Sequence, residues 1–484
     1  MQIAAAQEIR EAEQALFRSG AVTSAALMQR VVGRLVQAWR TLPLAAGMQR
    51  PARVVVYAGK GNNAGDAVGM AAQLGCPVLI RCADAQHTLS PDSAALLTEN
   101  CRFLDEAPES APDTLILDGL LGSGAAGALR PAYAALVQEM NVLRAASPRT
   151  LLLAVDIPTG LDSRDGTHGA AVVQADVTAA IGCVKPGLLA DGAEDAVGRL
   201  LTIPLPEVAL TPCDSARVAD AAEPCPTLPR RAYSCFKNRA GRVAIVAGSE
   251  GMTGAARLCA EAAVAAGAGL TVLYCHRAIY PILAAAVTPE VMVHPVDSYA
   301  EITEPDAAAL VVGPGLGTPA AEECAALRRL IENFPRTVVL DADGLNMAAR
   351  EGWKTFDDRF ILTPHPGEMR RLFPAAATLS RRETLRQFTQ QHTCTLLYKG
   401  ARTLIGQGET VWYNGSGGPY MANGGQGDVL AGVIGALAAQ GLPNLAAAVT
   451  AARACGYAAE RAWAANGYAP AVPARQVIQH LGKA

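Results

Sequence analysis

Short apolar runs that end in an aspartate or a glycine turn, each followed by a helix-like stretch, recur along both halves of the chain. The run RVVVYAGKGNNAGD has this form, and TLILDGLLGSG and TLLLAVDIPTGLDS repeat it. Apolar strands that alternate with helices make parallel sheets that are covered on both faces. The sequence therefore predicts an α/β fold, and in such folds ligands bind at the carboxyl ends of the strands.

A proline-rich stretch interrupts this series near the middle of the chain. Residues 204–230 contain many prolines and show little apolar periodicity, and GRVAIVAGSEGMTGAA then starts a second series of strand, glycine turn and helix. At about 150 residues per domain, a chain of 484 residues has room for two or three domains. We predict a first domain over residues 1–210, a linker over 211–230 and a second domain over 231–484.

Composition and charge exclude several classes of partner. The net charge is −3 and no basic stripe is visible, which argues against a nucleic-acid partner. The amino terminus, MQIAAAQEIREAEQAL, lacks the basic segment and apolar core of a secretory signal, and no uncharged apolar run reaches the roughly 18 residues of a membrane helix. The twelve cysteines stand singly and without zinc-site spacing. We expect a cytoplasmic protein that binds neither membranes nor nucleic acid.

The stretch NGGQGDVLAG, residues 423–432, crowds glycines around one aspartate before an apolar helix-like run. Glycine permits a positive φ, and a helix that starts near Gly427 and Asp428 would leave its first N–H groups free for an anion such as a phosphate. Asp428 could then act as a base on a hydroxyl beside that phosphate. The alternative is that Asp428 only complements the helix dipole and that the glycines form a turn.

Three further turns at predicted strand ends could contribute to the same site. Lys399 and Gly400 follow the strand-like run CTLLY, and a lysine with nearby backbone N–H groups suits a phosphate. His365 stands between two prolines directly after a strand, which stiffens its position, although a lone histidine is as often structural. The turn GPGLG at residues 313–317 permits close approach but is a weak signal by itself.

The amino-terminal stretch GKGNNAGDAVG, residues 59–69, has a different chemistry. Its loop carries Asn62, Asn63 and Asp66, and amide and carboxylate oxygens suit a hard cation. Asp118 and the turn at residues 156–159 could add further oxygens from neighbouring strand ends. The alternative is that these are ordinary turn residues. The glycines do not follow the order G-x-G-x-x-G, so this is not an ordinary dinucleotide fingerprint.

The ordered series of motifs resembles the family of bifunctional NAD(P)HX repair enzymes, in which an NAD(P)HX epimerase is fused to an ADP-dependent NAD(P)H-hydrate dehydratase. The resemblance covers nearly the whole chain, through GKGNNAGD, LDGLLGSG, VDIPTGLD, VVGPGLG, VLDADGLN, LTPHPGE, LLYKGARTLI and NGGQGDVLAG. It implies a Rossmann-like three-layer domain followed by a ribokinase-like α/β domain. The substrate would be NADH or NADPH with water added across the nicotinamide 5,6 double bond. The first domain would interconvert the R and S hydrates, and the second would dehydrate the S form.

The resemblance also implies a role for individual residues. In the epimerase, Asp156 would be the acid/base. The substrate would be bound by Asn62, Asn63, Ala64, Gly65, Asp66, Gly122, Ser123 and Gly124, and potassium by Asn63, Asp118 and Thr159. In the dehydratase, Asp428 would be the base. The hydrate would contact Ala255, Gly315 and His365, and the nucleotide Lys399, Gly400, Ala401, Arg402, Thr403 and Gly427. The implied cofactors are ADP, with ATP as the alternative, Mg²⁺ and K⁺. We expect a homo-oligomer, although the sequence itself does not specify the number of subunits.

The chain departs from the family pattern at a few positions. Ala64 and Ala67 stand where the family has glycines, and an alanine forced to a positive φ would cost about 1 kcal/mol or more. Thr159 replaces a serine but keeps the hydroxyl, and CFKNRAG at residues 235–241 lacks a histidine that the family has there. Two other functions stay open. A small-molecule kinase of the ribokinase-like group would not explain GNNAGD and VDIPTGLD, and a nucleotide sensor would have an inactive amino half.

Overall fold

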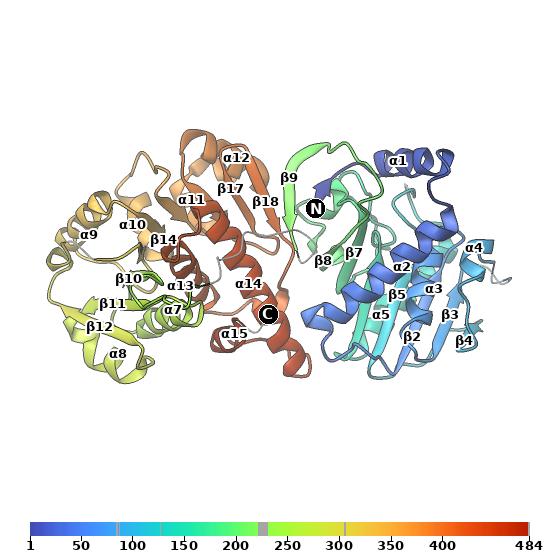
Figure 1. Cartoon of the computed structure of the whole chain (residues 1–484), viewed down its shortest axis with the longest axis horizontal. Helices are drawn as coiled ribbons and strands as arrows, with labels where there is room; N and C mark the ends of the chain where they lie inside the picture. The colour runs from blue at the N-terminus through green and yellow to red at the C-terminus, as the bar shows by residue number, and fades with distance from the viewer. Residues whose placement is uncertain (84–85, 87, 126, 221–230, 304–305, 483–484) are drawn as a thin grey trace. The chain divides into compact units, whose positions relative to one another are not determined.

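The computed structural model describes the chain apart from residues 84–85, 87, 126, 221–230, 304–305 and 483–484. The chain forms two compact units, residues 1–223 with 463–469 and residues 224–462 with 470–484 (Figure 1). Each unit contains a largely parallel sheet connected through helices, which confirms the predicted α/β fold class. None of the helices in the described residues is both long and apolar enough to cross a bilayer.

The sheet of the first unit has the strand order β4-β3-β2-β5-β6-β7-β8, and all neighbouring strands are parallel. Its strands are β2 (Arg53–Ala58), β3 (Val78–Cys82), β4 (Cys101–Leu104), β5 (Thr114–Gly119), β6 (Thr150–Val155), β7 (Val177–Gly182) and β8 (Arg199–Pro204). Its helices are α1 (Ala6–Arg18), α2 (Ser24–Thr41), α3 (Asn62–Ala72), α4 (Pro91–Ala94), α5 (Pro131–Ala145) and α6 (Glu194–Val197). The runs RVVVYA, TLILDG and TLLLAV form the three central strands, as their apolar character predicts.

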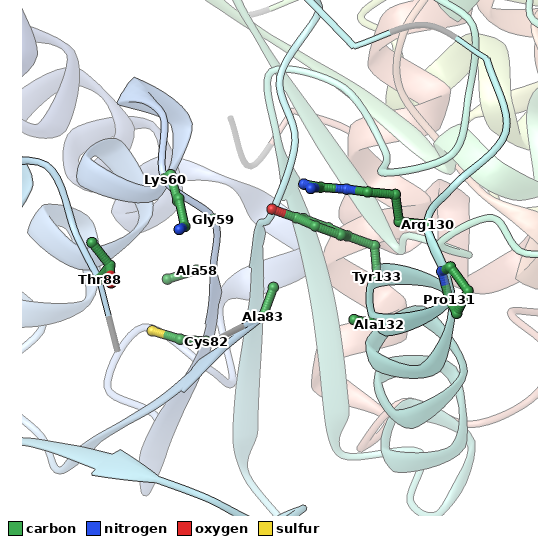
Figure 2. A pocket seen from close by; sticks show the side chains of 10 residues that line it. All are labelled: Ala58, Gly59, Lys60, Cys82, Ala83, Thr88, Arg130, Pro131, Ala132 and Tyr133. Atoms are coloured by element: carbon green, nitrogen blue, oxygen red, sulfur yellow. The ribbon is translucent and has the colours of Figure 1, made fainter. Parts of the chain in front are cut away.

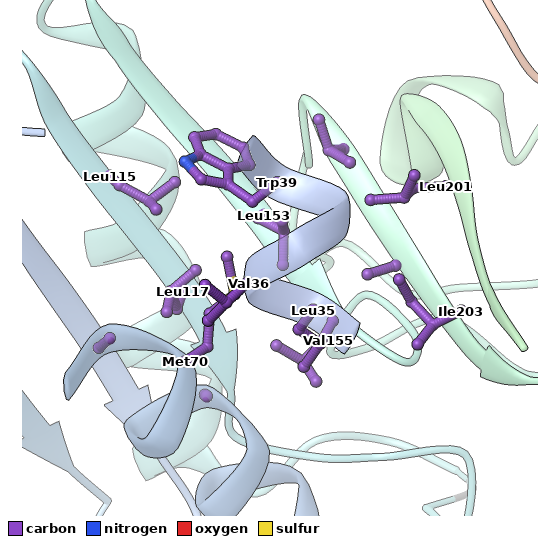
Figure 3. Close-up of a cluster of buried hydrophobic side chains, with 14 of the residues drawn as sticks. Leu35, Val36, Trp39, Met70, Leu115, Leu117, Leu153, Val155, Leu201 and Ile203 are labelled. Atoms are coloured by element: carbon purple, nitrogen blue, oxygen red, sulfur yellow. The ribbon is translucent and has the colours of Figure 1, made fainter. Parts of the chain in front are cut away.

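Both faces of this sheet are buried, because alternate residues of each central strand enter different cores. Val54 and Val56 of β2 belong to one core, and Val55 and Tyr57 belong to the other. The first core is closed by α2 and α3, and Figure 3 shows Trp39 and Met70 from these helices against the leucines of the sheet. The second core is closed by α5. The result is a three-layer unit.

Residues 2–41 form a short strand and two helices. Ile3 lies in β1 (Gln2–Ile3), and α1 and α2 are separated by a turn in which Gly20 has a φ of +73°. Thr23 caps the amino end of α2, and its hydroxyl accepts a hydrogen bond from Ala26 N at 3.2 Å. Strand β9 (Asp214–Ala219) pairs with β1 and lies within the predicted linker. Residues 221–230 of that linker lie outside the described residues, and the domain limits stay a prediction.

The sheet of the second unit has the order β18-β17-β16-β15-β14-β13-β10-β11-β12, parallel from β16 to β12. Its strands are β10 (Arg242–Val246), β11 (Leu270–His276), β12 (Val291–Val296), β13 (Ala309–Val312), β14 (Thr337–Leu340), β15 (Phe360–Leu362), β16 (Thr395–Tyr398), β17 (Leu404–Gln407) and β18 (Thr410–Asn414). The helices that begin in this unit are α7 (Thr253–Ala265), α8 (Tyr280–Ala286), α9 (Ala321–Asn333), α10 (Asp343–Arg350), α11 (Pro366–Leu372), α12 (Arg381–Gln391), α13 (Gln426–Ala439), α14 (Asn444–Ala465) and α15 (Ala474–His480).

Helix α13 lies in the interior of the second unit, and its glycines allow close packing on two sides. A Cβ atom on Gly432 would overlap the carbonyl oxygen of Cys259 in α7. On Gly435 it would lie 2.5 Å from the side chain of Val311 in β13. The helix is therefore in direct backbone contact with α7 and rests against the sheet, so the position of its first turn is fixed by the core.

Candidate active sites

Three residues predicted to bind a cation come together at the carboxyl ends of β5 and β6. Asp118 Oδ2 accepts a hydrogen bond from the N–H of Thr159 at 2.8 Å, and Asp118 Oδ1 accepts one from the Thr159 hydroxyl at 2.8 Å. The Asn63 amide donates to Leu121 O at 3.0 Å, and Leu121 N donates to Thr159 Oγ1 at 3.2 Å. These contacts hold amide, carboxylate and hydroxyl oxygens in one place.

The carboxyl group of Asp118 is fully buried. Burial raises the pKa of Asp118 to about 6, although the hydrogen bonds from Thr159 and Leu120 lower it in part. No lysine or arginine within the described residues forms an ion pair with it. A buried carboxylate without a counter-charge, surrounded by other oxygens, is the donor set of a cation site. The residues therefore fit a potassium ion.

Asp156 follows β6 directly and has a φ of +67°, a conformation that is uncommon for a residue other than glycine. Its Oδ1 atom forms an ion pair with Lys185 Nζ and accepts a hydrogen bond from Ile181 N at 3.3 Å. Its Oδ2 atom accepts a hydrogen bond from Ser123 N at 3.3 Å. A backbone held in a rarely occupied region marks a position that the surrounding structure constrains, and such positions cluster at functional sites.

Lys185 is the partner that the sequence did not indicate. Its side chain is completely buried, and its ammonium group also donates to Ile181 O at 2.9 Å and Cys183 O at 3.2 Å, so all three N–H bonds are used. Burial opposes its charge, but the contact with Asp156 outweighs burial, and the pKa of Lys185 is raised above its usual value. Lys185 is therefore a charged lysine held in a fixed position against the Asp156 carboxylate.

Helix α1 adds two charged residues, Arg10 and Glu13, that the sequence analysis did not single out. Burial and the charge of Asp156 raise the pKa of Glu13, and burial with the charges of Asp156 and Glu13 raises the pKa of Asp66 well above its usual range. The site thus has two further carboxyl groups of raised pKa close to Asp156. Arg10 Nη1 lies 2.8 Å from where a Cβ on Gly124 would stand, so its guanidinium group lies over that glycine.

The predicted substrate segments lie at the same edge of the sheet, but residues 62–66 form the start of helix α3 and not the loop that the sequence suggested. Gly122 faces Asn63, because a Cβ there would lie 3.6 Å from the Asn63 Cβ. Ser123 O accepts a hydrogen bond from the Ser163 hydroxyl at 3.4 Å. Gly65 lies inside α3, and a Cβ there would come within 2.7 Å of Ser93 Oγ, which accounts for the glycine. Asn62 is exposed at the start of this helix.

The two alanines that replace family glycines carry no backbone penalty. Ala64 and Ala67 are buried in α3, and neither has a positive φ. The cost considered for a positive φ therefore does not arise, and alanine is the residue with the highest helix propensity.

Two pockets open at this edge of the first unit. One has a volume of about 280 Å³ and is lined by residues 121–122, 125, 127–129, 157–162 and 167–169, which include Gly122 and Thr159. The other, which we name the Lys60 pocket, has a volume of about 230 Å³ and is lined by residues 58–60, 82–83, 88 and 130–133 (Figure 2). Asp156 lines neither of them.

In the second unit, the predicted helix start is confirmed. Helix α13 begins at Gln426, and Gly425 before it has a φ of +94°, a conformation that favours glycine. Val429 is the first residue that bonds back within the helix, to Gly425 O at 3.1 Å, so the N–H groups before it are left at the open end of the helix. This end combines unpaired N–H groups with the positive pole of the helix dipole, which is the arrangement that binds phosphate.

Lys399 and Gly427 lie together at this helix end. A Cβ on Gly427 would stand 3.4 Å from Lys399 Nζ and 3.6 Å from Asp341 Oδ2. Lys399 Nζ is 2.7 Å from Asp341 Oδ1 and 3.8 Å from Glu368 Oε2. Burial opposes its charge, but attraction to Asp341 and Glu368 raises the pKa of Lys399 above its usual value. The helix end therefore carries a permanent cation.

Asp428 stands in the first turn of α13 among these charges. Burial and the charge of Asp341 together raise the pKa of Asp428 to about 7, although the charge of Lys399 lowers it in part. A carboxyl group with a pKa near neutrality can accept a proton in one step and release it in the next, as a general base must. Asp428 thus has the electrostatic setting of a base beside an anion site.

Asp341 and Glu368 are functional candidates that the sequence analysis passed over. Asp341 is buried, accepts a hydrogen bond from the Thr363 hydroxyl at 2.7 Å and precedes Ala342, which has a φ of +47°. Glu368 binds the N–H of His365 at 2.8 Å, and His365 Nδ1 accepts from Gly367 N at 2.9 Å. The signal for Asp341 was present, because it follows a strand in VLDADGLN as Asp156 does in VDIPTGLD.

The remaining predicted residues lie near two turns, one at residues 313–317 beside α7 and one at residues 400–403. Gly315, with a φ of +59°, lies against α7, and a Cβ there would be 2.8 Å from the Cβ of Ala255. The next glycine of that turn, Gly317, donates its N–H to Asp343 Oδ2 at 2.7 Å. The turn at residues 400–403 closes on itself through a hydrogen bond from the Thr403 hydroxyl to Gly400 O at 3.2 Å. It is also bonded to Arg381, which donates to Arg402 O at 2.9 Å, and Ala401 is exposed.

Comparison with known proteins finds matches for both halves of the chain. A family model described as NAD(P)H-hydrate dehydratase matches residues 243–483, and one described as YjeF-related protein N-terminus matches residues 24–187. The bifunctional NAD(P)H-hydrate repair enzyme Nnr of Coxiella burnetii is 31% identical over 98% of this chain and 97% of its own. That of Escherichia coli is 34% identical over 84% of this chain and 80% of its own. The ADP/ATP-dependent NAD(P)H-hydrate dehydratase of Bacillus subtilis, co-crystallised with ATP/Mg²⁺, is 27% identical over 53% of this chain and 93% of its own, with a TM-score of 0.46.

Proposed function

The chain belongs to the family of bifunctional NAD(P)H-hydrate repair enzymes, and from this we propose how its two units divide the work. The first unit interconverts the R and S hydrates of NADH and NADPH. The second removes water from the S hydrate and returns the intact cofactor. The observation that carries the second assignment is the open end of α13, where Lys399 and Asp428 meet.

In the second unit, Asp428 takes the proton from the C6 hydroxyl of the hydrate. The open N–H groups of α13 and the ammonium group of Lys399 hold the phosphates of the nucleotide and stabilise negative charge as it develops. When bound, ADP or ATP with Mg²⁺ would supply the phosphoryl group that makes this hydroxyl a good leaving group; the oxygen would leave C6 as phosphate, and loss of a proton from C5 would restore the double bond. We assign Ala255, Gly315 and His365 to contacts with the hydrate, and residues 400–403 to the rest of the nucleotide.

In the first unit, Asp156 acts as the acid/base for the hydroxyl at C6: the ring nitrogen lone pair expels this hydroxyl as water, and water that adds to the opposite face of C6 gives a proton back. Lys185 neutralises the charge of Asp156 and fixes its orientation, while the start of α3 at residues 62–66 and the loop at residues 122–124 hold the substrate against it. Asp66 and Glu13, whose pKa values are raised by burial and by neighbouring carboxylates, lie close enough to Asp156 to share in this proton transfer. Asn63, Asp118 and Thr159 would hold a potassium ion.

The experiment that tests the assignment follows the return of NADH absorbance at about 340 nm. With S-NADHX, ADP and Mg²⁺, recovery requires only the second unit, and with R-NADHX it requires both. A small-molecule kinase would leave the absorbance unchanged, and a sensor would bind nucleotide without turnover. Failure with both hydrates and both nucleotides would overturn the proposal.

We predict that the acidic limb of the dehydration pH profile reports Asp428. Since a base must be ionised, kcat/KM should fall as pH drops through about 7, the raised pKa of this group. The Asp341→Asn variant removes a charge that raises this pKa and frees Lys399 to attract Asp428, so the limb should move to lower pH. The exposed Asp358→Asn serves as the control with the same change of charge. An unmoved limb in Asp341→Asn would contradict the assignment.

We also predict that potassium stabilises the first unit. At pH 7, KCl should raise the melting temperature of the wild type above the value in tetramethylammonium chloride of equal ionic strength, because only K⁺ offsets the buried charge of Asp118. The Asp118→Asn variant, which has no charge to offset, should lose this difference. A potassium effect of the same size in the variant would show that the ion binds elsewhere.

A further inference from the structure

Two carbonyl groups of the turn at residues 400–403 are held by donors within the protein. Gly400 O accepts a hydrogen bond from the Thr403 hydroxyl at 3.2 Å. Arg402 O accepts one from Arg381 Nη2 at 2.9 Å, a bond that the charge of the guanidinium group strengthens. Because these two oxygens are bonded inside the protein, the turn presents less negative charge to a ligand.

The N–H groups of the same turn are available. Within the part of the chain that the structure describes, Gly400, Ala401 and Thr403 donate no backbone hydrogen bond. Gly400 and Ala401 are also exposed. Successive N–H groups in a turn form a concavity that binds anions, and phosphates are the anionic groups of a nucleotide. The turn therefore has the polarity that a phosphate site requires.

Arg381 reaches this turn from the first residue of α12. Helix α12 precedes β16 and packs against β16 and β17 (Figure 1), and the turn joins these two strands. The guanidinium group lies directly against Gly400, because a Cβ there would overlap Arg381 Nη1 and stand 3.0 Å from its Cζ. The three atoms nearest to that Cβ all belong to Arg381, and Gly400 does not have a positive φ. The contact with Arg381, and not the backbone conformation, accounts for the glycine.

The turn adjoins the open end of α13. Lys399 directly precedes the turn, and its ammonium group lies 3.4 Å from where a Cβ on Gly427 would stand. The N–H groups of the turn and those of α13 therefore lie on the two sides of one lysine. An arginine that fixes the turn acts on the same anion site as Lys399, although it stands on another helix.

We propose that Arg381 is a positioning residue for the nucleotide. It holds the carbonyl of Arg402 and the backbone at Gly400, so that the free N–H groups of the turn receive the phosphates of ADP. This rests on the proposed dehydratase function and adds a residue to its nucleotide site. Without the guanidinium group, the carbonyl of Arg402 loses its donor and can turn toward the phosphates and repel them. Arg381 thus acts on nucleotide affinity and not on proton transfer to Asp428.

The test measures ADP binding by calorimetry and the dehydration of S-NADHX at about 340 nm in the wild type and in Arg381→Met. The dissociation constant and the KM for ADP should each rise by about tenfold, the effect of one lost hydrogen bond to a charged group. At saturating ADP, kcat and the KM for S-NADHX should stay near the wild-type values, whereas a loss of fold would lower kcat. Arg381→Lys, which restores a donor, should recover part of the affinity.

The matched control is Arg386→Met, which removes an exposed arginine from the same helix and should leave ADP affinity unchanged. Unchanged ADP affinity in Arg381→Met, or an equal loss in Arg386→Met, would overturn the proposal.

A double-mutant cycle with Gly400→Ala separates the contact between Gly400 and Arg381 from a direct contact of Gly400 with ADP. In the wild-type background the new methyl group would displace the guanidinium group, so Gly400→Ala should lower ADP affinity about as much as Arg381→Met. In the Arg381→Met background the methyl group meets no guanidinium group, and the second substitution should cost little. Additive losses would show that Gly400 acts on ADP without Arg381 and would contradict the proposal.

This proposal and the proposed function can fail separately. If the wild type binds ADP with an affinity that depends on Arg381 but does not dehydrate S-NADHX, the dehydratase function fails and the assignment of Arg381 stands. If the wild type dehydrates S-NADHX and its ADP affinity does not depend on Arg381, the function stands and the assignment fails.

Discussion

Replacing Asp428 with asparagine should reduce dehydration of S-NADHX by about 10³-fold, the usual contribution of a general base. The substitution keeps the size of the side chain and removes only its ability to accept the proton of the C6 hydroxyl. Nucleotide affinity should change little, because the open N–H groups of α13 and Lys399 remain. The measurements are the recovery of absorbance at about 340 nm and the titration of ADP by calorimetry.

The matched control for this experiment is Asp358→Asn, which removes an exposed carboxylate from the same unit. Epimerisation of R-NADHX by the first unit should continue in the Asp428→Asn variant. This activity would show that the remainder of the chain is intact. Normal dehydration by Asp428→Asn would show that another group is the base. If the variant loses both nucleotide binding and turnover, Asp428 is needed to bind the nucleotide at the helix end and is not shown to be the base.

Replacing Lys185 with methionine should lower epimerisation by at least about 10²-fold and also destabilise the first unit. Asp156 would then be left in a buried place without its counter-charge, and breaking a buried ion pair in this way costs about 3–5 kcal/mol. The measurements are the rate of conversion of R-NADHX to the S form and the midpoint of urea unfolding. Dehydration of S-NADHX should be unaffected.

Two further variants separate the chemistry from the loss of stability. Arg199 and Asp220 form a second buried ion pair in the first unit, at 2.7 Å, and Arg199→Met should cost similar stability without slowing epimerisation per folded molecule. The double variant Lys185→Met, Asp156→Asn removes both charges and should regain part of the stability but none of the activity. If Lys185→Met keeps the wild-type rate, the lysine only supports the fold.

Much of this arrangement was accessible from the sequence, because each strand ends in a local signal. Runs such as TLLLAV predict the central strands. The glycines at 425 and 427 predict the start of α13 and hence the position of Asp428. The family resemblance then supplied roles for residues that the strand ends bring together, such as Asn63, Asp118 and Thr159.

Lys185, Glu13 and Asp341 could not be assigned in the same way. Lys185 meets Asp156 only because β6 and β7 are neighbours in the sheet, and Glu13 approaches Asp156 from a helix far away in the sequence. Nothing in GCVKPG shows that its lysine has a carboxylate partner. Asp341 carried a local signal, but its contact with Lys399 depends on the order of β14, β15 and β16. Which side chains meet from neighbouring strands depends on the order of the strands in the sheet, and a single sequence does not specify that order.

The close contact of α13 with α7 limits how the second unit can respond to its ligands. With Gly432 against the Cys259 carbonyl, the helix has no room to slide or turn about its axis. Any tightening around ADP or the hydrate must therefore come from the connecting segments at the rim, such as residues 415–425 and 399–403. Variants that alter the rate of product release should accordingly map to those segments, while changes within α13 should affect folding yield.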